Sequence, residues 1–351
     1  MKRLLLRTPV LWAGVFLWWG CTPDGGTTEA ATSREETHQL SGEAFGTTWN
    51  VTWLGEAPSE ALARAEIDAV LHAADRQMST WRSDSELEAV RRGSGAVVVS
   101  EATADVVRAA LELASQTGGA FDPTVQPLME FWGFHGTPRG SWPTDDAIDA
   151  ARQGTGWQKV VVARDVEARP TVDAGGTALD LSAIAKGDAV DRVSRVLSQL
   201  GAADHLVEIG GEVVAHGHNP RGTAWTLGVD LPVSKAREGY AAHVRLTNHG
   251  LATSGNYRNV RRVGDRVVGH SIDPRTGVPT QTDVVSASVV APDCRTADGW
   301  ATALMVLGAD EGLALLASEP DVHAWLMVQD EEGAVTSRGS ERASRFFVPV
   351  R

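Results

Sequence analysis

Short apolar segments with strand character follow one another closely in the second half of the chain. They cover residues 205–209, 212–215, 224–229, 243–247, 266–272 and 284–291. Strand-like segments separated by only a few residues favour hairpins, because a tight turn lets consecutive strands pair side by side. This part of the chain is therefore expected to form sheets in which neighbouring strands are largely antiparallel.

Apolar residues recur at three-to-four spacing elsewhere, which is typical of helices with one buried face. The helices expected on this basis cover residues 60–78, 100–117, 144–153, 185–200, 296–307 and 310–318. Ser100 and Thr144 are expected as helix caps. Further strands are expected at residues 45–54, 159–163 and 177–181, and a Gly- and Pro-rich loop at 131–142.

Strands outnumber helices in this assignment, and no separable linker interrupts residues 45–351. The expected fold class is α+β, with mixed or antiparallel sheets and packed helices in two interlocked lobes. Residues 41–351 are expected to form a single domain.

The first twenty residues have the pattern of an export signal. Three cations, the last of them Arg7, precede ten uncharged residues, Val10–Trp19. Ten residues are too few to span a bilayer as a helix but match the core of a signal peptide. Gly20-Cys21 then resembles the lipobox of bacterial lipoproteins, in which the cysteine is acylated and becomes the mature N-terminus. An ordinary signal peptide with an incidental cysteine is the alternative.

We therefore expect residues 1–20 to be a signal peptide and residues 21–40 a flexible tether anchored by lipid at Cys21. The tether is rich in Thr, Gly, Ala, Ser and Glu and poor in large apolar residues. The expected location is the periplasmic side of a bacterial membrane. Thr22 stands where an aspartate commonly marks inner-membrane retention, which leaves the outer membrane open.

Charge and cysteine content exclude several classes of protein. Lys and Arg number 32 and Asp and Glu 45, so the net charge is −13. This balance argues against a protein that grips a nucleic acid backbone. Two cysteines are too few for a disulfide scaffold or a four-cysteine metal site. The Walker A pattern and a strand-linked G-x-G-x-x-G are both absent, which disfavours P-loop ATPases and dinucleotide dehydrogenases.

Two patterns point to chemistry. Lys186 lies at the start of an expected helix, where the helix dipole disfavours a cation; it is either solvated or the partner of a bound anion such as a phosphate. Asp298 and Thr302 are four residues apart on another expected helix, so a carboxylate and a hydroxyl share one face. Such hard oxygen ligands suit Mg²⁺ or Ca²⁺, although an aspartate near a helix N-terminus is also favoured by the dipole alone.

In their order along the chain, eight groups of residues resemble the FAD:protein FMN transferase family, the ApbE-like flavin transferases. They are Phe45–Thr48, Met78–Leu87, Phe121–Val125 with Phe131–Phe134, Asp180–Gly187, Glu208–Glu212, Ala252–Tyr257, His270–Gly277 and Ala297–Ala303. The resemblance spans residues 45 to about 308. It implies the ApbE-like fold and a single FAD-binding transferase domain.

The resemblance further implies a Mg²⁺-dependent enzyme that cleaves FAD, releases AMP and attaches FMN by a phosphoester bond. The acceptor would be a Thr or Ser of an exported or membrane redox protein. Positions that match the family's FAD site are Phe45, Trp81, Ala120, Phe121, Asp122, Asp180, Lys186 and Ile272. Those that match its Mg²⁺ site are the backbone carbonyl of Ala183 with Asp298 and Thr302. Phe45 and Trp81 stand where family members often have Met and Tyr.

Phosphoryl transfer of this kind needs charge neutralisation and a base for the acceptor hydroxyl. Lys186 is expected to draw charge from the pyrophosphate. His270 is the leading candidate for the base, because a histidine titrates near neutral pH, and Asp283 is the second. Alternatively, His270 only orients the turn at Asp273.

Two other functions stay open. The same site could act as a Mg²⁺-dependent FAD pyrophosphatase that releases FMN and AMP, with water in place of the acceptor. A flavin-binding lipoprotein without chemistry would need the pocket residues but not Asp298, Thr302 or His270, so their presence favours an enzyme.

Overall fold

The structure, a computed structural model, describes residues 36–350 except 138, 232–238 and 257–259. An eight-stranded sheet forms the centre, in the order β1-β2-β6-β7-β10-β15-β16-β17. Its strands are β1 (Thr37–Ala44), β2 (Thr47–Leu54), β6 (His205–Ile209), β7 (Glu212–His216), β10 (His249–Gly255), β15 (Val284–Ala291), β16 (His323–Gln329) and β17 (Val335–Gly339). Every neighbouring pair is antiparallel. The closely spaced segments at 205–209 and 212–215 form the hairpin β6–β7, as expected.

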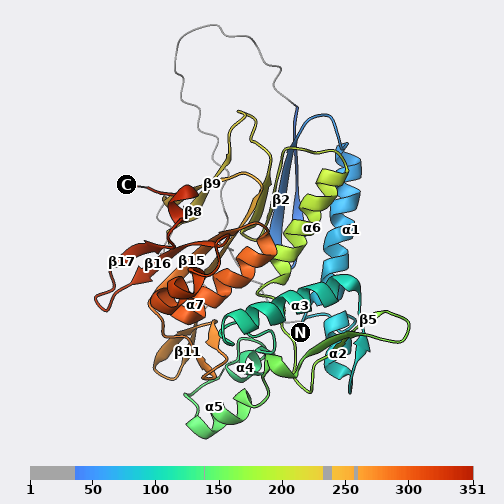
Figure 1. The fold of residues 1–351 in the computed structure, drawn as a ribbon. Helices are drawn as coiled ribbons and strands as arrows, with labels where there is room; N and C mark the ends of the chain where they lie inside the picture. Colours follow the sequence, from blue (N-terminus) through green and yellow to red (C-terminus); the bar gives the residue numbers. More distant parts are fainter. Residues whose placement is uncertain (1–35, 138, 232–238, 257–259, 351) are drawn as a thin grey trace, which may run out of the picture.

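Three long helices pack on one face of this sheet (Figure 1). They are α1 (Glu60–Met78), α6 (Ala185–Gln199) and α7 (Cys294–Leu316). By length and hydropathy α7 could cross a membrane, but 67% of its most apolar stretch is buried inside the protein. It is therefore the core helix of the large sheet.

A small three-stranded sheet, in the order β18-β9-β8, covers the other face. Its strands are β8 (Trp225–Asp230), β9 (Tyr240–Leu246) and β18 (Phe347–Pro349), the last preceded by the short helix η2 (Ala343–Arg345). Because side chains alternate between the two faces of a strand, the large sheet packs against the helices on one face and against the small sheet on the other. In β6, Leu206 packs toward the small sheet, whereas its neighbour Val207 packs toward the helices.

The remaining elements form the second lobe, below the large sheet in Figure 1. Its helices are α2 (Glu86–Arg92), α3 (Glu101–Gln116), α4 (Gln126–Phe131), α5 (Asp145–Arg152) and η1 (Trp157–Lys159). Its strands are β3 (Val97–Val98), β4 (Val161–Arg164), β5 (Pro170–Asp173), β11 (Val260–Val263), β12 (Arg266–Gly269), β13 (Ile272–Asp273) and β14 (Val278–Pro279). A separate apolar cluster that includes Leu128, Trp132 and Val268 holds α4, α5 and the β11–β12 hairpin together.

The predicted helix caps are confirmed. Ser100 Oγ accepts a hydrogen bond from Thr103 N at 3.2 Å, and Thr144 Oγ1 accepts one from Ala147 N at 3.3 Å. The helices predicted at 296–307 and 310–318 are the two halves of α7, which is kinked at Gly308 (φ 78°, ψ 178°).

Three predictions differ from the structure. Residues 177–181 are not a strand: they run irregularly, because Asp180 N bonds to Pro123 O in the second lobe and not to a neighbouring strand. The predicted loop at 131–142 begins on the last residue of α4. Residues 37–40, predicted as the end of the tether, pair with β2 as the first half of β1. The predicted signal peptide, Cys21 and the tether up to residue 35 lie outside the described residues.

Candidate active site

A cleft of about 1370 Å³ is lined by residues of both lobes. It brings together every predicted site residue except Cys21, which is not described, and Asp283. The predicted residues that line it are Phe45, Trp81, Ala120, Phe121, Asp122, Asp180, Ala183, Lys186, His270, Ile272, Asp298 and Thr302. Residues separated by more than 250 positions in the sequence therefore share one cavity.

Charged residues from α6, α7 and β7 lie together in the cleft: Glu212 and Asp298 are buried, and Lys186 is partly buried. Lys186 Nζ lies 2.5 Å from Glu212 Oε1, and Gly187 N donates a hydrogen bond to Asp298 Oδ2 at 3.1 Å. Glu212 Oε2 is buried and has no hydrogen-bond partner in the part of the chain that the structure describes.

Glycine at position 187 permits this arrangement. A Cβ there would lie 2.4 Å from the backbone oxygen of Cys294. Only a residue without a side chain lets α6 approach α7 closely enough for its backbone to contact Asp298.

Burial and mutual charge shift the pKa values of this cluster. Burial raises the pKa of Glu212 to about 7, and the neighbouring Asp298 adds to the rise. Burial likewise raises the pKa of Asp298, against the opposing charge of Lys186. Burial alone would lower the pKa of Lys186, but the two carboxylates outweigh it and raise that pKa. Lys186 is thus an ammonium facing two carboxyl groups, so the cluster has room for further positive charge.

The residues in this part of the cleft fit a magnesium ion. Asp298 and Thr302 lie one turn apart on α7, as their spacing predicted, and Ala183 lines the same cavity. Among the described residues no group of three or more His, Cys, Asp or Glu side chains could hold a metal. Mg²⁺ does not need such a group, because it is usually bound through one or two carboxylates together with substrate phosphates.

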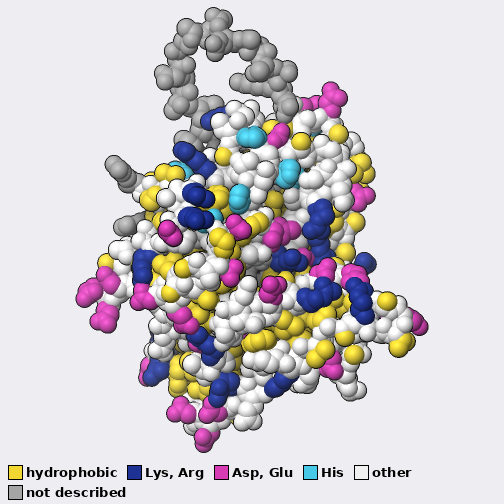
Figure 2. Space-filling model, viewed as in Figure 1, with side chains coloured by type: hydrophobic (Ala, Val, Ile, Leu, Met, Phe, Trp, Pro, Cys, Tyr) yellow, Lys and Arg dark blue, Asp and Glu magenta, His cyan; other side chains and the backbone are white. Residues whose placement is uncertain are grey.

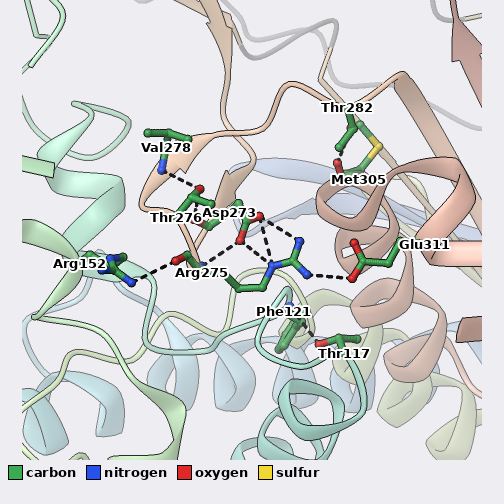
Figure 3. A network of polar contacts seen from close by, with 10 residues as sticks. All are labelled: Thr117, Phe121, Arg152, Asp273, Arg275, Thr276, Val278, Thr282, Met305 and Glu311. Carbon is green, nitrogen blue, oxygen red and sulfur yellow. Dashed lines mark hydrogen bonds and ion pairs between the residues drawn. The ribbon is translucent and has the colours of Figure 1, made fainter. Parts of the chain in front are cut away.

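The loop that follows α3 positions the predicted FAD residues of the second lobe. Thr117 Oγ1 accepts a hydrogen bond from Phe121 N at 3.1 Å (Figure 3). The Asp122 carboxylate accepts hydrogen bonds from Thr124 N at 2.7 Å and Thr124 Oγ1 at 2.6 Å. Burial raises the pKa of Asp122, and these hydrogen bonds oppose the rise. Asp122 thereby fixes the shape of the loop that carries Phe121.

The aromatic end of the cleft is open to solvent. Trp81 is 81% exposed and contacts the His135 ring edge-on at 5.6 Å between centroids. Phe121 and Ile272 are buried on the cleft wall, whereas Phe45 is partly buried and has a positive φ of 54°. Large flat side chains around an apolar slot suit the face of a fused ring system.

His270 follows β12 directly and lines the cleft, with its ring edge-on to Phe134 at 6.5 Å between centroids. Downstream of it, the Asp273 carboxylate accepts hydrogen bonds from Arg275 Nε at 3.0 Å (Figure 3). Arg275 also pairs with Glu311 on α7 at 2.9 Å, and Arg152 on α5 donates to the Arg275 carbonyl at 3.2 Å. This network ties the Asp273 turn to helices of both lobes.

The second candidate base, Asp283, does not belong to the described lining of the cleft. Its Oδ1 accepts a hydrogen bond from Ala309 N at 3.2 Å, directly after the kink at Gly308. The neighbouring Thr282 Oγ1 donates to the Met305 carbonyl at 2.9 Å, just before the kink (Figure 3). The two side chains satisfy the backbone groups that the broken helix leaves open, so Asp283 has a structural role.

Glu212 is the last residue of the family-like motif Glu208–Glu212, but no role was predicted for it from the sequence. The available signal was a carboxylate directly after Gly210-Gly211, in a chain that also has an unexplained lysine at a helix start. Only the packing of α6 against β7 places Glu212 beside Lys186.

Fold and cleft together are those of a transferase that handles flavin nucleotides, as comparison with known proteins confirms. The ApbE family profile matches residues 45–326. A relative from Klebsiella pneumoniae (strain 342), named FAD:protein FMN transferase, is 36% identical over 96% of each chain. One of the same name from Vibrio cholerae is 36% identical over 90% of this chain and 92% of its own.

Two solved structures have the same fold. The flavin transferase ApbE from Vibrio cholerae matches with a TM-score of 0.78 and 34% identity, covering 89% of this chain and 99% of its own. The apo flavinyl transferase ApbE from Pseudomonas stutzeri matches with a TM-score of 0.80 and 31% identity, covering 91% and 99%. The chain belongs to the ApbE family, and both the resemblance and the α+β class predicted from the sequence are confirmed.

Proposed function

We propose that this protein is a Mg²⁺-dependent FAD:protein FMN transferase. It would cleave the pyrophosphate of FAD, release AMP and attach FMN to a Thr or Ser hydroxyl of an exported or membrane redox protein. One observation carries the proposal: the cleft joins an aromatic end, open to solvent, to a charged cluster of Lys186 with the buried carboxylates of Glu212 and Asp298. The first suits a flavin and the second a pyrophosphate with its counter-ion.

The residues of the charged cluster have different roles in neutralising the negative charge of the pyrophosphate. Lys186 lines the cleft and stabilises negative charge on the pyrophosphate oxygens as the leaving group departs. Asp298, Thr302 and the Ala183 carbonyl would hold Mg²⁺, which when bound supplies further positive charge to the same oxygens. Glu212 orients Lys186 through their 2.5 Å ion pair.

The reaction exchanges one phosphorus–oxygen bond for another. The acceptor hydroxyl oxygen bonds to the FMN phosphorus, and the bond to AMP breaks with its electron pair on the AMP oxygen. His270 lines the cleft and accepts the proton that the hydroxyl loses. We do not assign this proton to Asp283, because its carboxylate is bonded to the backbone of α7.

We further propose that the protein is exported and held at the periplasmic side of a bacterial membrane by lipid on Cys21. The support is the sequence: three cations, ten uncharged residues and Gly20-Cys21, followed by a polar tether. This location would place the cleft beside redox proteins that face the same compartment.

The first prediction is that Asp298→Ala lowers Mg²⁺-dependent turnover at least about 100-fold, because a metal at this point contributes several kcal/mol of charge stabilisation. Incubation with FAD, Mg²⁺ and an acceptor protein bearing a Thr, followed by a denaturing gel, detects transfer as a fluorescent acceptor band. AMP release is measured in parallel. Asp321→Ala, at an exposed turn outside the described lining of the cleft, is the control.

Each outcome has a separate meaning. A fluorescent acceptor band with AMP supports the transferase, and AMP without a labelled band supports the FAD pyrophosphatase. Tight FAD retention with neither product identifies a flavin-binding protein without chemistry. Unchanged turnover in Asp298→Ala would refute the metal assignment.

A further inference from the structure

The β11–β12 hairpin lies at the edge of the cleft. Val260 and Arg261 line the cavity at its start, and His270 follows its last residue. The two strands pair only with each other in the part of the chain that the structure describes. Their outer edges therefore offer backbone groups to an added strand.

The hairpin has two different faces. Val263 and Val268 are buried in the apolar cluster of the second lobe and anchor one face. The opposite face is exposed: Arg262 and Val267 are directly across from each other in the strand register. Val267 is 60% exposed and Val260 is 48% exposed, although valines are usually buried.

Arginine gathers on this hairpin. Residues 260–269 include three arginines, Arg261, Arg262 and Arg266, and one acidic residue, Asp265, in a chain whose net charge is −13. By the strand register Arg262 belongs to the exposed face, whereas Arg261 and Arg266 are paired with Val268 and Val263 on the anchored face. The guanidinium of Arg261 lies over the Phe134 ring at 5.6 Å, and that of Arg266 over the Trp142 ring at 4.3 Å. These contacts hold two of the three cations in place. In Figure 2, basic and apolar side chains lie side by side in the lower part of the molecule, where Figure 1 shows β11.

We propose that the exposed face of this arginine hairpin, residues 260–269, docks an acidic, extended segment of the acceptor protein. This inference rests on the proposed function, which requires a protein segment to bring a hydroxyl into the cleft. Charge complementarity identifies the occupant: the hairpin has three arginines to one aspartate, with Arg262 on its exposed face, and on an acidic protein this local positive charge attracts acidic segments.

The position of the hairpin explains how docking would serve the reaction. An extended segment added to its edge gains main-chain hydrogen bonds, while its side chains contact the hairpin's exposed arginine and valines. Since Val260 and Arg261 line the cleft, a hydroxyl a few residues along the same segment reaches His270. Arg262 and Val267 on the exposed face lie outside the described lining of the cleft, so this face would select the acceptor without belonging to the FAD site.

The test measures binding of dye-labelled peptides to the full chain by fluorescence anisotropy, with FAD affinity measured separately. One peptide carries a threonine flanked by aspartates, and the other carries lysines in their place. We expect the aspartate peptide to bind at least about tenfold more tightly, with a preference that fades as salt shortens the range of charge interactions. The double substitution Arg262→Glu with Val267→Asp should abolish or reverse the preference and leave FAD affinity unchanged.

The matched control is Arg342→Glu with Val166→Asp, an exposed arginine and an exposed valine outside the described lining of the cleft. It should keep the wild-type preference. Equal affinity of wild type and hairpin variant for the aspartate peptide would overturn the proposal. Binding of vesicles with anionic lipid, lost in the hairpin variant and without any peptide preference, would overturn it in favour of a membrane surface.

Different results would refute the proposed transferase function and the proposed docking face. Absence of FMN transfer by the wild type, with the peptide preference intact, would refute the proposed function and support the docking face. Transfer that proceeds with equal KM for the acceptor in wild type and hairpin variant would refute the docking face alone.

Discussion

Lys186 lies in the first turn of α6, where the dipole of the helix disfavours a positive charge. Two neighbouring carboxylates explain why it is stable there. A cation in the first turn of a helix faces the positive end of the dipole. Glu212 and Asp298, from a strand and a second helix, supply the opposing charge. Because removing one partner from a buried ion pair leaves an uncompensated charge, the three residues depend on one another.

His205 gives the second prediction, which concerns stability against pH. It is fully buried, its Nε2 lies 2.7 Å from Ser194 Oγ, and burial lowers its pKa from 6.5 to about 4. The unfolded chain therefore binds more protons than the folded one between these pH values. The contribution of neutral His205 to the unfolding free energy is therefore complete above pH 6.5. It falls by up to about 3 kcal/mol as the pH decreases toward 4.

Urea unfolding of wild type and His205→Gln between pH 4 and 7 checks this prediction. The difference in unfolding free energy between them should shrink by about 3 kcal/mol as the pH falls, because the variant lacks the titrating group. His218→Gln, whose parent side chain is 57% exposed, should track the wild type. Parallel curves for wild type and His205→Gln would contradict the prediction.

Among single residues, the sequence predicted site residues that are related by helical spacing. It did not predict those that only tertiary packing brings together. Asp298 and Thr302 lie four residues apart, so helical geometry alone puts them on one face. Glu212 is 26 positions from Lys186, and no periodicity joins them. For Asp283, predicted as the second candidate base, local spacing likewise did not reveal the hydrogen bond with Ala309, which lies 26 positions further along the chain, just after the kink in α7.

Among the elements, α7 shows how a break in a helix is made stable. Gly308 adopts φ 78° and ψ 178°, a conformation that is essentially restricted to glycine. Thr282 and Asp283 then bond to the Met305 carbonyl and the Ala309 amide on either side of the break. The kink separates the half of α7 that carries Asp298 and Thr302 from the half that carries Glu311.

The third prediction follows from this arrangement. Asp283→Ala should lower the unfolding free energy by about 1 kcal/mol, the usual effect of losing a helix cap, and leave turnover within about twofold of wild type. Gly308→Ala should cost about 1–3 kcal/mol through backbone strain. Thermal unfolding and AMP release measure the two effects. A large loss of turnover in Asp283→Ala, at full stability, would restore it as the candidate base.

Element prediction failed where a segment was polar or irregular. The first half of β1, residues 37–40, was assigned to the tether because this segment contains only one large aliphatic residue, Leu40. It forms because β2 offers a partner, with Thr37 opposite Leu54. Residues 177–181 have strand composition but are drawn toward the second lobe by the Asp180–Pro123 hydrogen bond. In both places tertiary pairing overrides local composition.

For the molecule as a whole, the net charge and the order of its segments along the chain are compatible with the proposed attachment to a membrane surface. Removal of residues 1–20 deletes three cations and no anion, which takes the net charge from −13 to −16. The arginine hairpin then stands out against a more acidic protein. If the proposed lipid anchor is present, the polar residues between Cys21 and the domain would let the cleft reach acceptors at varying heights above the bilayer.

The fourth prediction tests the anchor. If Cys21 is acylated, the mature protein should begin at Cys21, carry the mass of its lipid and partition into a detergent phase, since two acyl chains suffice for stable membrane attachment. Cys21→Ser should lose the lipid mass, and the same chain without residues 1–20 should stay in the aqueous phase with its FAD affinity unchanged. Cys294→Ala is the matched control, because that thiol is buried in the domain and should receive no lipid. A wild-type protein that is cut elsewhere than at Cys21, or that stays in the aqueous phase after export, would refute the lipid anchor and leave an ordinary signal peptide.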